Sequence, residues 1–160
     1  MRKRLMWASA TLALVIAACG SSSPTSSASP AKTCVNASAA HHAYVVVEHL
    51  SGASLQKCVG FAGDTIDGQS LMDQSTIPYQ TQTFSFGKGV CAIDNEPAQY
   101  TECFPKNKPY WSLFIETGGV WAAAQTGYTA VSLHDKDALG WHYVDASEQN
   151  PSPPPFAKEG

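Results

Sequence analysis

The sequence predicts a single, mainly β domain of about six or seven strands with one short helix. Residues 109–144 hold three of the four tryptophans and alternate large apolar with smaller or polar side chains, as strands do. A second stretch, residues 44–50, is rich in β-branched side chains. Turn residues, most of them including glycine, separate these stretches at short intervals, which favours strands joined by turns over long helices.

The first eighteen residues have the organisation of a bacterial lipoprotein signal peptide. A basic start precedes residues 5–17, an apolar stretch too short to span a bilayer comfortably. It ends in Ile16-Ala17-Ala18-Cys19, the pattern of a lipobox, whose cysteine receives diacylglycerol. We expect the mature chain to begin at Cys19 and to be lipid-anchored on the extracytoplasmic face of the cell membrane. The alternative is an ordinary secretory signal with an incidental cysteine.

Low-complexity segments flank the predicted β domain, residues 34–146. Residues 19–33 comprise the lipidated cysteine and a Ser/Pro-rich tether without large apolar side chains, which predicts a flexible linker. Residues 147–160 form a proline-rich tail, which we expect not to pack. The part between is long enough for one domain with one modest core.

The charge of the chain argues against nucleic acid as a partner. The whole sequence has a formal charge of −3, with ten basic and thirteen acidic residues. Without the three basic residues of the leader, seven basic residues remain against thirteen acidic ones, a charge of −6. Nucleic acids and anionic membrane surfaces attract basic clusters, and the sequence has none in the mature part.

Four cysteines remain after Cys19, and an even number in an exported chain indicates two disulfides. Three pairings are possible. We favour Cys34–Cys58 and Cys91–Cys103, because each closes a local loop. A metal site at these cysteines is a weak alternative, since there is no Cys-x-x-Cys and export favours oxidation.

The expected elements follow one another along the chain from residue 44. A short helix at 69–74 follows the Asp67-Gly68 turn and is bounded by Pro78. Gly118-Gly119 supplies the positive φ angles of a two-residue hairpin turn. A further turn is expected at 134–137. The strands are expected at residues 44–50, 54–61, 81–86, 90–93, 110–116, from 120 on, and 139–144.

The aromatic region is expected to form an edge of the sheet. Tyr110 and Trp111 lie on opposite faces of their strand, so at most one of them should belong to the core. Trp141 and Tyr143 share a face, and alternation does not separate their roles.

No motif for catalysis is present, so we expect no enzymatic activity. The sequence lacks a nucleophile elbow, a Ser-x-x-Lys pair, a phosphate-binding glycine loop and a dinucleotide fingerprint. His41 and His42 are adjacent and would point to opposite faces of a strand. A metal group could form from His134, Asp135, Asp137 and His142, but solvated turn residues are the commoner explanation and no metal site is predicted. The paired aspartates Asp64 and Asp67, and Asp135 and Asp137, are interpreted as turn formers.

The aromatic residues are the better candidates for a binding site. Tryptophan and tyrosine offer a large flat contact area with a polar group, which suits a planar or ring-bearing ligand. The alternative is that they form the core, as two or three such residues commonly do in small β domains. The candidate ligand-binding residues are Tyr110, Trp111, Trp121, Tyr128 and Trp141.

Four features of this stretch resemble the transcobalamin C-terminal-like domain family. They are the aromatic-tryptophan strand at 110–116, the Gly-Tyr pair at 127–128, the aspartate-rich turn and the closing Trp-x-Tyr at 141–143. Lys136 stands where the family usually has glycine in its Asp-Gly-Asp turn. The resemblance covers roughly residues 43–145. It implies a β-grasp-like core, and in the animal cobalamin carriers this domain closes over the corrin ring.

The resemblance implies a function at the cell surface. We expect a non-enzymatic lipoprotein that captures a small-molecule ligand and passes it to a membrane transporter; the ligand that the resemblance implies is a corrinoid such as cobalamin. No other cofactor is expected. The alternative is a tethered interaction module whose aromatic edge binds a partner protein or a cell-wall glycan.

Overall fold

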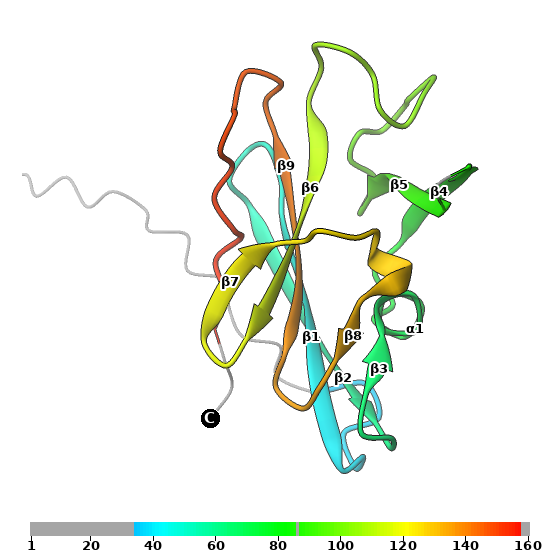
Figure 1. Cartoon of the computed structure of the whole chain (residues 1–160), viewed down its shortest axis with the longest axis vertical. Coiled ribbons are helices and arrows are strands. Elements are labelled where there is room, and N and C mark those ends of the chain that lie inside the picture. Colours follow the sequence, from blue (N-terminus) through cyan, green and yellow to red (C-terminus); the bar gives the residue numbers. More distant parts are fainter. Residues whose placement is uncertain (1–33, 86, 158–160) are drawn as a thin grey trace, which may run out of the picture.

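The computed structural model describes residues 34–85 and 87–157, and within them the chain is mainly β with one short α-helix (Figure 1). The predicted lipoprotein signal and the whole of the predicted tether lie outside the described residues. The expected fold class is confirmed, although nine strands form rather than six or seven because two of them contain only two residues. The elements are β1 (His41–Glu48), β2 (Ser54–Phe61), β3 (Ile66–Asp67), α1 (Gly68–Gln74), β4 (Tyr79–Phe84), β5 (Gly87–Ile93), β6 (Tyr110–Thr117), β7 (Val120–Ala123), the 3₁₀ turn η1 (Tyr128–Ala130), β8 (Ser132–Leu133) and β9 (Ala138–Val144).

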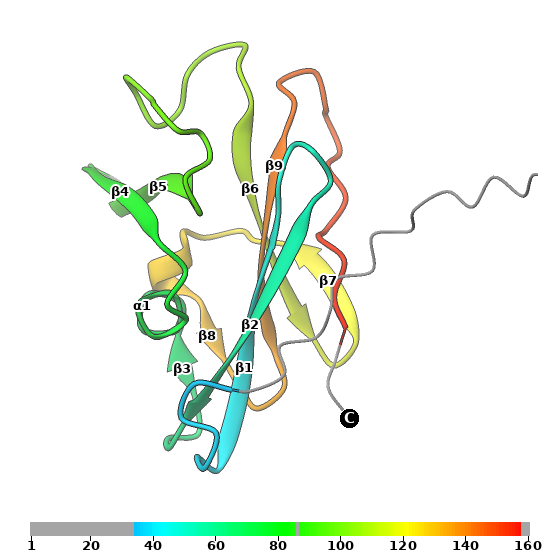
Figure 2. The same ribbon diagram turned by 180° about the vertical axis from the view of Figure 1, so that it is seen from behind.

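A five-stranded sheet in the order β2-β1-β9-β6-β7 forms the frame of the domain. The central strands β1 and β9 are parallel, and every other neighbouring pair is antiparallel. Helix α1 follows the β1–β2 hairpin and lies on one side of the sheet (Figures 1 and 2). This hairpin–helix–parallel-strand arrangement is β-grasp-like. The smaller β3–β8 and β4–β5 pairs lie on the same side as α1.

The aromatic region does not lie wholly at the sheet edge, as the sequence suggested. Of the three strands that this region contributes to the five-stranded sheet, β7 is an edge strand, β6 lies next to it and β9 is the middle strand. Strand β9 is buried at six of its seven positions and has no acidic or basic residue other than His142. A near-continuous apolar run of this kind is typical of a strand that is covered on both faces.

The main core lies between the sheet and the α1 side. Val45 and Val47 of β1 and Leu139 and Trp141 of β9 point into it, together with Leu71 of α1. Alternate residues of β1, such as Tyr44 and Val46, point to the other face. They are also buried, in a smaller second cluster.

The proline-rich tail packs on this second face, contrary to the expectation that it would not. Phe156 contacts the rings of Tyr44 and Trp121, and Pro154 is buried. In both views the tail runs along the side of the sheet opposite α1 (Figures 1 and 2). Composition indicated a solvated tail, but the apolar outer face of β1 and β9 provides a surface that such a segment can cover.

Helix α1 forms where the sequence predicted it. The Asp67 side chain caps it by accepting a hydrogen bond from the Ser70 backbone N–H at 2.9 Å. Hydrogen bonds from Ser70 lower the pKa of the Asp67 carboxyl below its ordinary value. Leu71 and Met72 face inward and are fully buried.

Both favoured disulfide pairings are present. Cys34 pairs with Cys58 and Cys91 pairs with Cys103, with Cα–Cα distances of 4.5 and 4.3 Å. The first ties the start of the domain to β2, and the second ties the long loop between β5 and β6 back to β5. A bridge that closes a loop of about fifteen residues is worth about 3 kcal/mol in the chain-entropy description.

The turn before β9 is fixed by its aspartates. Asp137 Oδ2 accepts from the His134 backbone N–H, and Asp135 Oδ1 accepts from the His42 backbone N–H, both at 2.8 Å. Lys136 has a φ of 70°, a conformation that glycine adopts at lower cost. The two aspartates are therefore turn formers, and one of them also holds the turn against β1.

Gly68, the first residue of α1, permits a close approach between the helix and η1. A Cβ atom there would lie 2.2 Å from the Tyr128 carbonyl oxygen, so Gly68→Ala must displace backbone. We expect a loss of about 1–3 kcal/mol of stability, measured by chemical denaturation. Gly63→Ala is the matched control, because its Cβ would meet only Thr65 O at 3.5 Å. Equal midpoints for the two variants would contradict the close-packing interpretation.

Candidate ligand-binding site

Two pockets lie on the α1 side of the sheet, and Trp111 lines both of them. The larger, pocket A, has a volume of about 390 Å³ and lies under the loop formed by residues 94–109. The smaller, pocket B, has a volume of about 270 Å³ and lies between β5, η1 and the sheet. Ligand pockets typically measure 300–1,000 Å³, so pocket A is at the lower end of that range.

The 94–109 loop over pocket A is held at both ends. At its start, His49 Nδ1 lies 2.6 Å from Glu96 Oε2 and His49 Nε2 lies 3.3 Å from Asp94 Oδ2. The indole N–H of Trp111 donates to the Glu96 carbonyl at 3.0 Å. Towards its other end the Cys91–Cys103 disulfide attaches it to β5. These contacts give a segment without regular secondary structure a defined path over the sheet.

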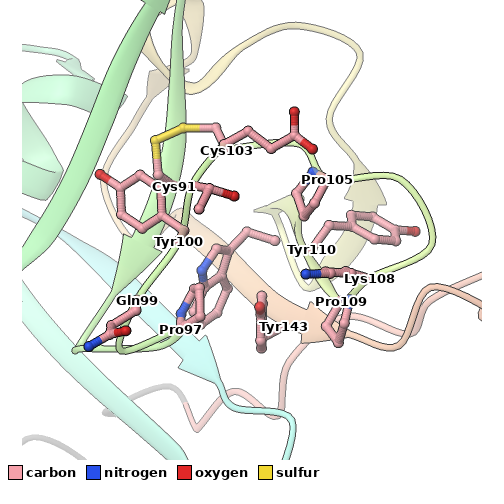
Figure 3. Close-up of a pocket in the computed structure, with 13 residues that line it drawn as sticks. Cys91, Pro97, Gln99, Tyr100, Cys103, Pro105, Lys108, Pro109, Tyr110 and Tyr143 are labelled. Atoms are coloured by element: carbon pink, nitrogen blue, oxygen red, sulfur yellow. A yellow bond between two sulfur atoms is a disulfide. The ribbon is translucent and has the colours of Figure 1, made fainter.

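Aromatic and proline side chains surround pocket A, together with two opposite charges. In Figure 3 the disulfide and Tyr100 lie on one side, Tyr110 and Lys108 on the other, and Tyr143 at the base. The Tyr143 ring packs on Trp111, with 4.8 Å between centroids. Burial, and to a lesser degree the nearby Glu96 carboxylate, raises the pKa of Tyr143. The Lys108 and Glu102 side chains can supply polar contacts at the rim.

Pocket B is more apolar. Leu113, Tyr128 and Trp141 line it beside Trp111, and Phe104 closes it from the loop. The Trp141 N–H is buried and has no hydrogen-bond partner within the described part of the chain. Such orphaned groups commonly bind an ordered water.

The Tyr128 hydroxyl lies next to that of Tyr79, without a well-aligned hydrogen bond between them. The Tyr79 hydroxyl in turn donates to the Asp73 carboxylate. Burial raises the pKa of both tyrosines, and the Asp73 carboxylate raises both further. Both phenols therefore stay neutral at physiological pH and connect η1 to the region of α1.

Four of the five candidate residues line these pockets. Tyr110 and Trp111 line pocket A, and Trp111, Tyr128 and Trp141 line pocket B. As expected, Trp111 is a core residue while Tyr110 is half-buried. Tyr128 and Trp141 are also core residues that present one edge to a pocket.

The fifth candidate, Trp121, lies apart from these four. Its ring covers Gly140 and contacts Phe156 on the opposite face of the sheet. Trp121 therefore does not share a site with the other four candidate residues. Strand β7 pairs with β6 in a register that places Trp121 opposite Glu116. Both side chains point to the face of the sheet that lies away from the pockets.

Sequence reasoning missed several residues of pocket A. Tyr100, Glu102, Lys108 and Tyr143 were not among the candidates, although all four line the pocket. Tyr100 lies between two cysteines in a loop with three prolines, at 97, 105 and 109. A long proline-containing loop closed by a disulfide is itself a signal of a binding loop and could have located the first three.

The histidine and aspartate residues considered for a metal do not come together. His134 Nδ1 lies 3.6 Å from Asp137 Oδ2, whereas His142 comes five residues after Asp137, about 17 Å away at strand spacing. His142 instead faces Glu48 and the Ser152 carbonyl. Among residues 34–85 and 87–157, no group of three or more His, Cys, Asp or Glu side chains could hold a metal ion.

Comparisons with known proteins leave the family open. No protein-family model matches the chain, and no curated protein matches it. Among solved structures there is a weak similarity to a "putative metal binding protein" from Ruminococcus gnavus. The identity is 15% and the TM-score 0.48, over 66% of this chain and 97% of that one. The resemblance to the transcobalamin C-terminal-like family therefore stays a prediction, and function has to be argued from the site.

No helix in the described residues has the length and apolar character needed to cross a bilayer. The predicted lipidation site, Cys19, precedes them. Membrane attachment through Cys19 stays a prediction.

The buried phenols predict a loss of stability in alkali. Tyr79, Tyr128 and Tyr143 have raised pKa values in the folded chain. Their contribution to folding stability is therefore complete below the ordinary tyrosine pKa of about 10. It declines above that pH, because the unfolded chain releases these protons first. Denaturation midpoints measured from neutral pH upward should fall beyond about pH 10. Ultraviolet titration should show these three of the six tyrosines ionising only with unfolding. Six phenols that titrate together in the folded chain would contradict this.

Proposed function

We propose that the chain is a non-enzymatic binding domain that captures a small ring-bearing molecule beside Trp111. The observation that carries the proposal is the position of this residue: a single indole lines both pockets and also donates to the loop that covers pocket A. Pre-formed pockets with aromatic walls and a few polar groups are the usual form of a small-molecule site. Glu102 and Lys108 would orient the ligand.

The volume of the pockets limits the size of the ligand that they can hold. A corrinoid is the ligand that the family resemblance implies, but pocket A, at about 390 Å³, suits one or two fused rings or one edge of a corrin. We therefore place a compact aromatic or heterocyclic compound ahead of an intact corrinoid as the ligand. Both belong in the same titration.

Anchoring at Cys19 would hold this domain at the outer face of the membrane, where it could pass its ligand to a transporter. The residues that precede Cys34 provide the tether between lipid and domain in this proposal.

Titration of the full chain in detergent should identify the ligand class. The panel is cobalamin, a haem, and compounds of one or two aromatic rings, followed by tryptophan fluorescence and calorimetry. Tyr100→Ala should weaken binding roughly tenfold, equivalent to about 1.4 kcal/mol, because Tyr100 forms an outer wall of pocket A. Tyr100 is 37% exposed, so the variant should keep its stability.

Two control substitutions distinguish the loss of a pocket contact from a general effect on the charge or fold of the domain. Lys108→Ala should weaken binding of an anionic ligand, whereas Lys106→Ala should not, because Lys106 is exposed and does not line the pocket. Trp121→Phe, on the other face of the sheet, should leave the affinity unchanged. The proposal fails if no compound binds at up to about 1 mM, or if Tyr100→Ala and Lys108→Ala bind like wild type.

The anchor is tested independently. Cys19→Ala should leave the protein unprocessed or release it from membranes, since its thiol is the predicted acylation site. Cell fractionation and mass spectrometry of the first residue provide the measurement. A wild-type protein that is wholly soluble and carries no lipid would refute the anchor and leave the pocket proposal standing.

A further inference from the structure

A groove on the outer face of the sheet holds the proline-rich tail of the chain. Its wall is formed by the rings of Tyr44 of β1 and Trp121 of β7, both of which meet Phe156 at an edge-on angle. The ring centroids are 5.2 and 5.8 Å apart. Its floor is Gly140 of β9, where a Cβ atom would lie 2.6 Å from the Trp121 ring and 2.9 Å from Pro154. Only a glycine allows the indole and the proline to lie flat on this strand.

Two side chains bind the backbone of the tail. Gln56 Nε2 donates to the Ala157 carbonyl at 2.8 Å, and its Oε1 accepts from the Ala157 N–H at 3.2 Å. His142 Nδ1 lies 2.8 Å from the Ser152 carbonyl oxygen, at hydrogen-bond distance. Gln56 is 5% exposed, and the tail supplies one hydrogen-bond partner to its amide nitrogen and one to its amide oxygen. Gln56 and His142 thus hold the tail through its backbone at two points, five residues apart.

The part of the tail that lies in the groove resembles a polyproline ligand in sequence. Residues 151–156 read Pro-Ser-Pro-Pro-Pro-Phe, and successive prolines favour the extended polyproline II conformation with its backbone carbonyls free to accept. Domains that recognise such peptides use aromatic-lined grooves and a few donors to backbone carbonyls. Tyr44, Trp121, Gln56 and His142 provide that combination.

We propose that this groove is a recognition site for proline-rich peptides of a partner protein, with the tail of the chain as its intramolecular competitor. The partner would carry a short run of prolines followed by an aromatic residue. Because a tethered segment competes at an effective concentration of roughly millimolar, an external peptide binds only when it outcompetes the tail or when the tail is weakened. The groove lies on the face opposite the two pockets, so this proposal does not depend on the ligand captured there.

The test uses the full chain with a weakened tail, Pro154→Ala/Phe156→Ala. A fluorescent peptide with the sequence of residues 149–158 is titrated into this variant and into wild type, and its anisotropy is measured. The weakened-tail variant should bind the peptide at least about tenfold more tightly than wild type does, because the competing segment has lost its anchors. A peptide with alanine in place of its phenylalanine should lose at least about tenfold in affinity.

Two further variants link binding to the groove. Gln56→Leu, made in the weakened-tail background, keeps the side-chain volume and removes both backbone hydrogen bonds, so it should reduce peptide binding. Lys57→Leu is its control, because Lys57 is exposed on the neighbouring position of β2. Circular dichroism and intact disulfides establish that each variant is folded.

Absence of peptide binding to a folded weakened-tail variant would overturn the proposal. So would equal binding of the alanine peptide, or equal effects of the Gln56 and Lys57 substitutions. A wild-type chain that dimerises with concentration, while its weakened-tail variant stays monomeric and binds no peptide, would show that the natural occupant is the tail of a second copy.

Discussion

The parallel pairing of β1 with β9 is the interaction on which the rest of the structure depends. These strands are far apart in the sequence, yet Tyr44 to Glu48 pair in register with Ala138 to His142. Parallel neighbours need a long crossover, and here the crossover contains α1, both two-stranded sheets and the loop over pocket A. The pairing places two nearly uncharged strands at the centre of the sheet, and both faces of those strands must then be covered.

Covering the two faces gives the molecule its two candidate surfaces. On one face, α1, η1 and the β4–β5 hairpin bury the core and leave room beside Trp111. On the other face, the tail buries Phe156 and Pro154 against Tyr44, Trp121 and Gly140. The register of β6 and β9 decides which aromatic residue goes to which face, because successive side chains alternate.

Trp111 links stability to the proposed binding activity. Its ring packs on Tyr143 and its N–H fixes the Glu96 carbonyl at the start of the loop. The same loop end is held by His49, which lies between the carboxylates of Asp94 and Glu96. Substitutions at Trp111 therefore disturb both the wall of the pockets and the position of their cover, which is why Tyr100 is the cleaner probe of binding.

The sequence by itself determined the features that depend on local chemistry. A β-branched run located β1, the alternation of two faces located β6, and Asp67-Gly68 located α1. The even number of cysteines, paired locally, predicted both disulfides. Alternation also separated Tyr110 from Trp111. Only the tertiary structure decided that β9 is the central strand and that Trp121 lies away from the pockets. It also decided that Tyr100 and Lys108 line pocket A and that the proline-rich tail packs on the outer face of the sheet. Most of these outcomes depend on which distant strands pair and in what register, and no short stretch of the sequence specifies that pairing. The exception is β9, whose near-continuous apolar run is a local sign of its central position.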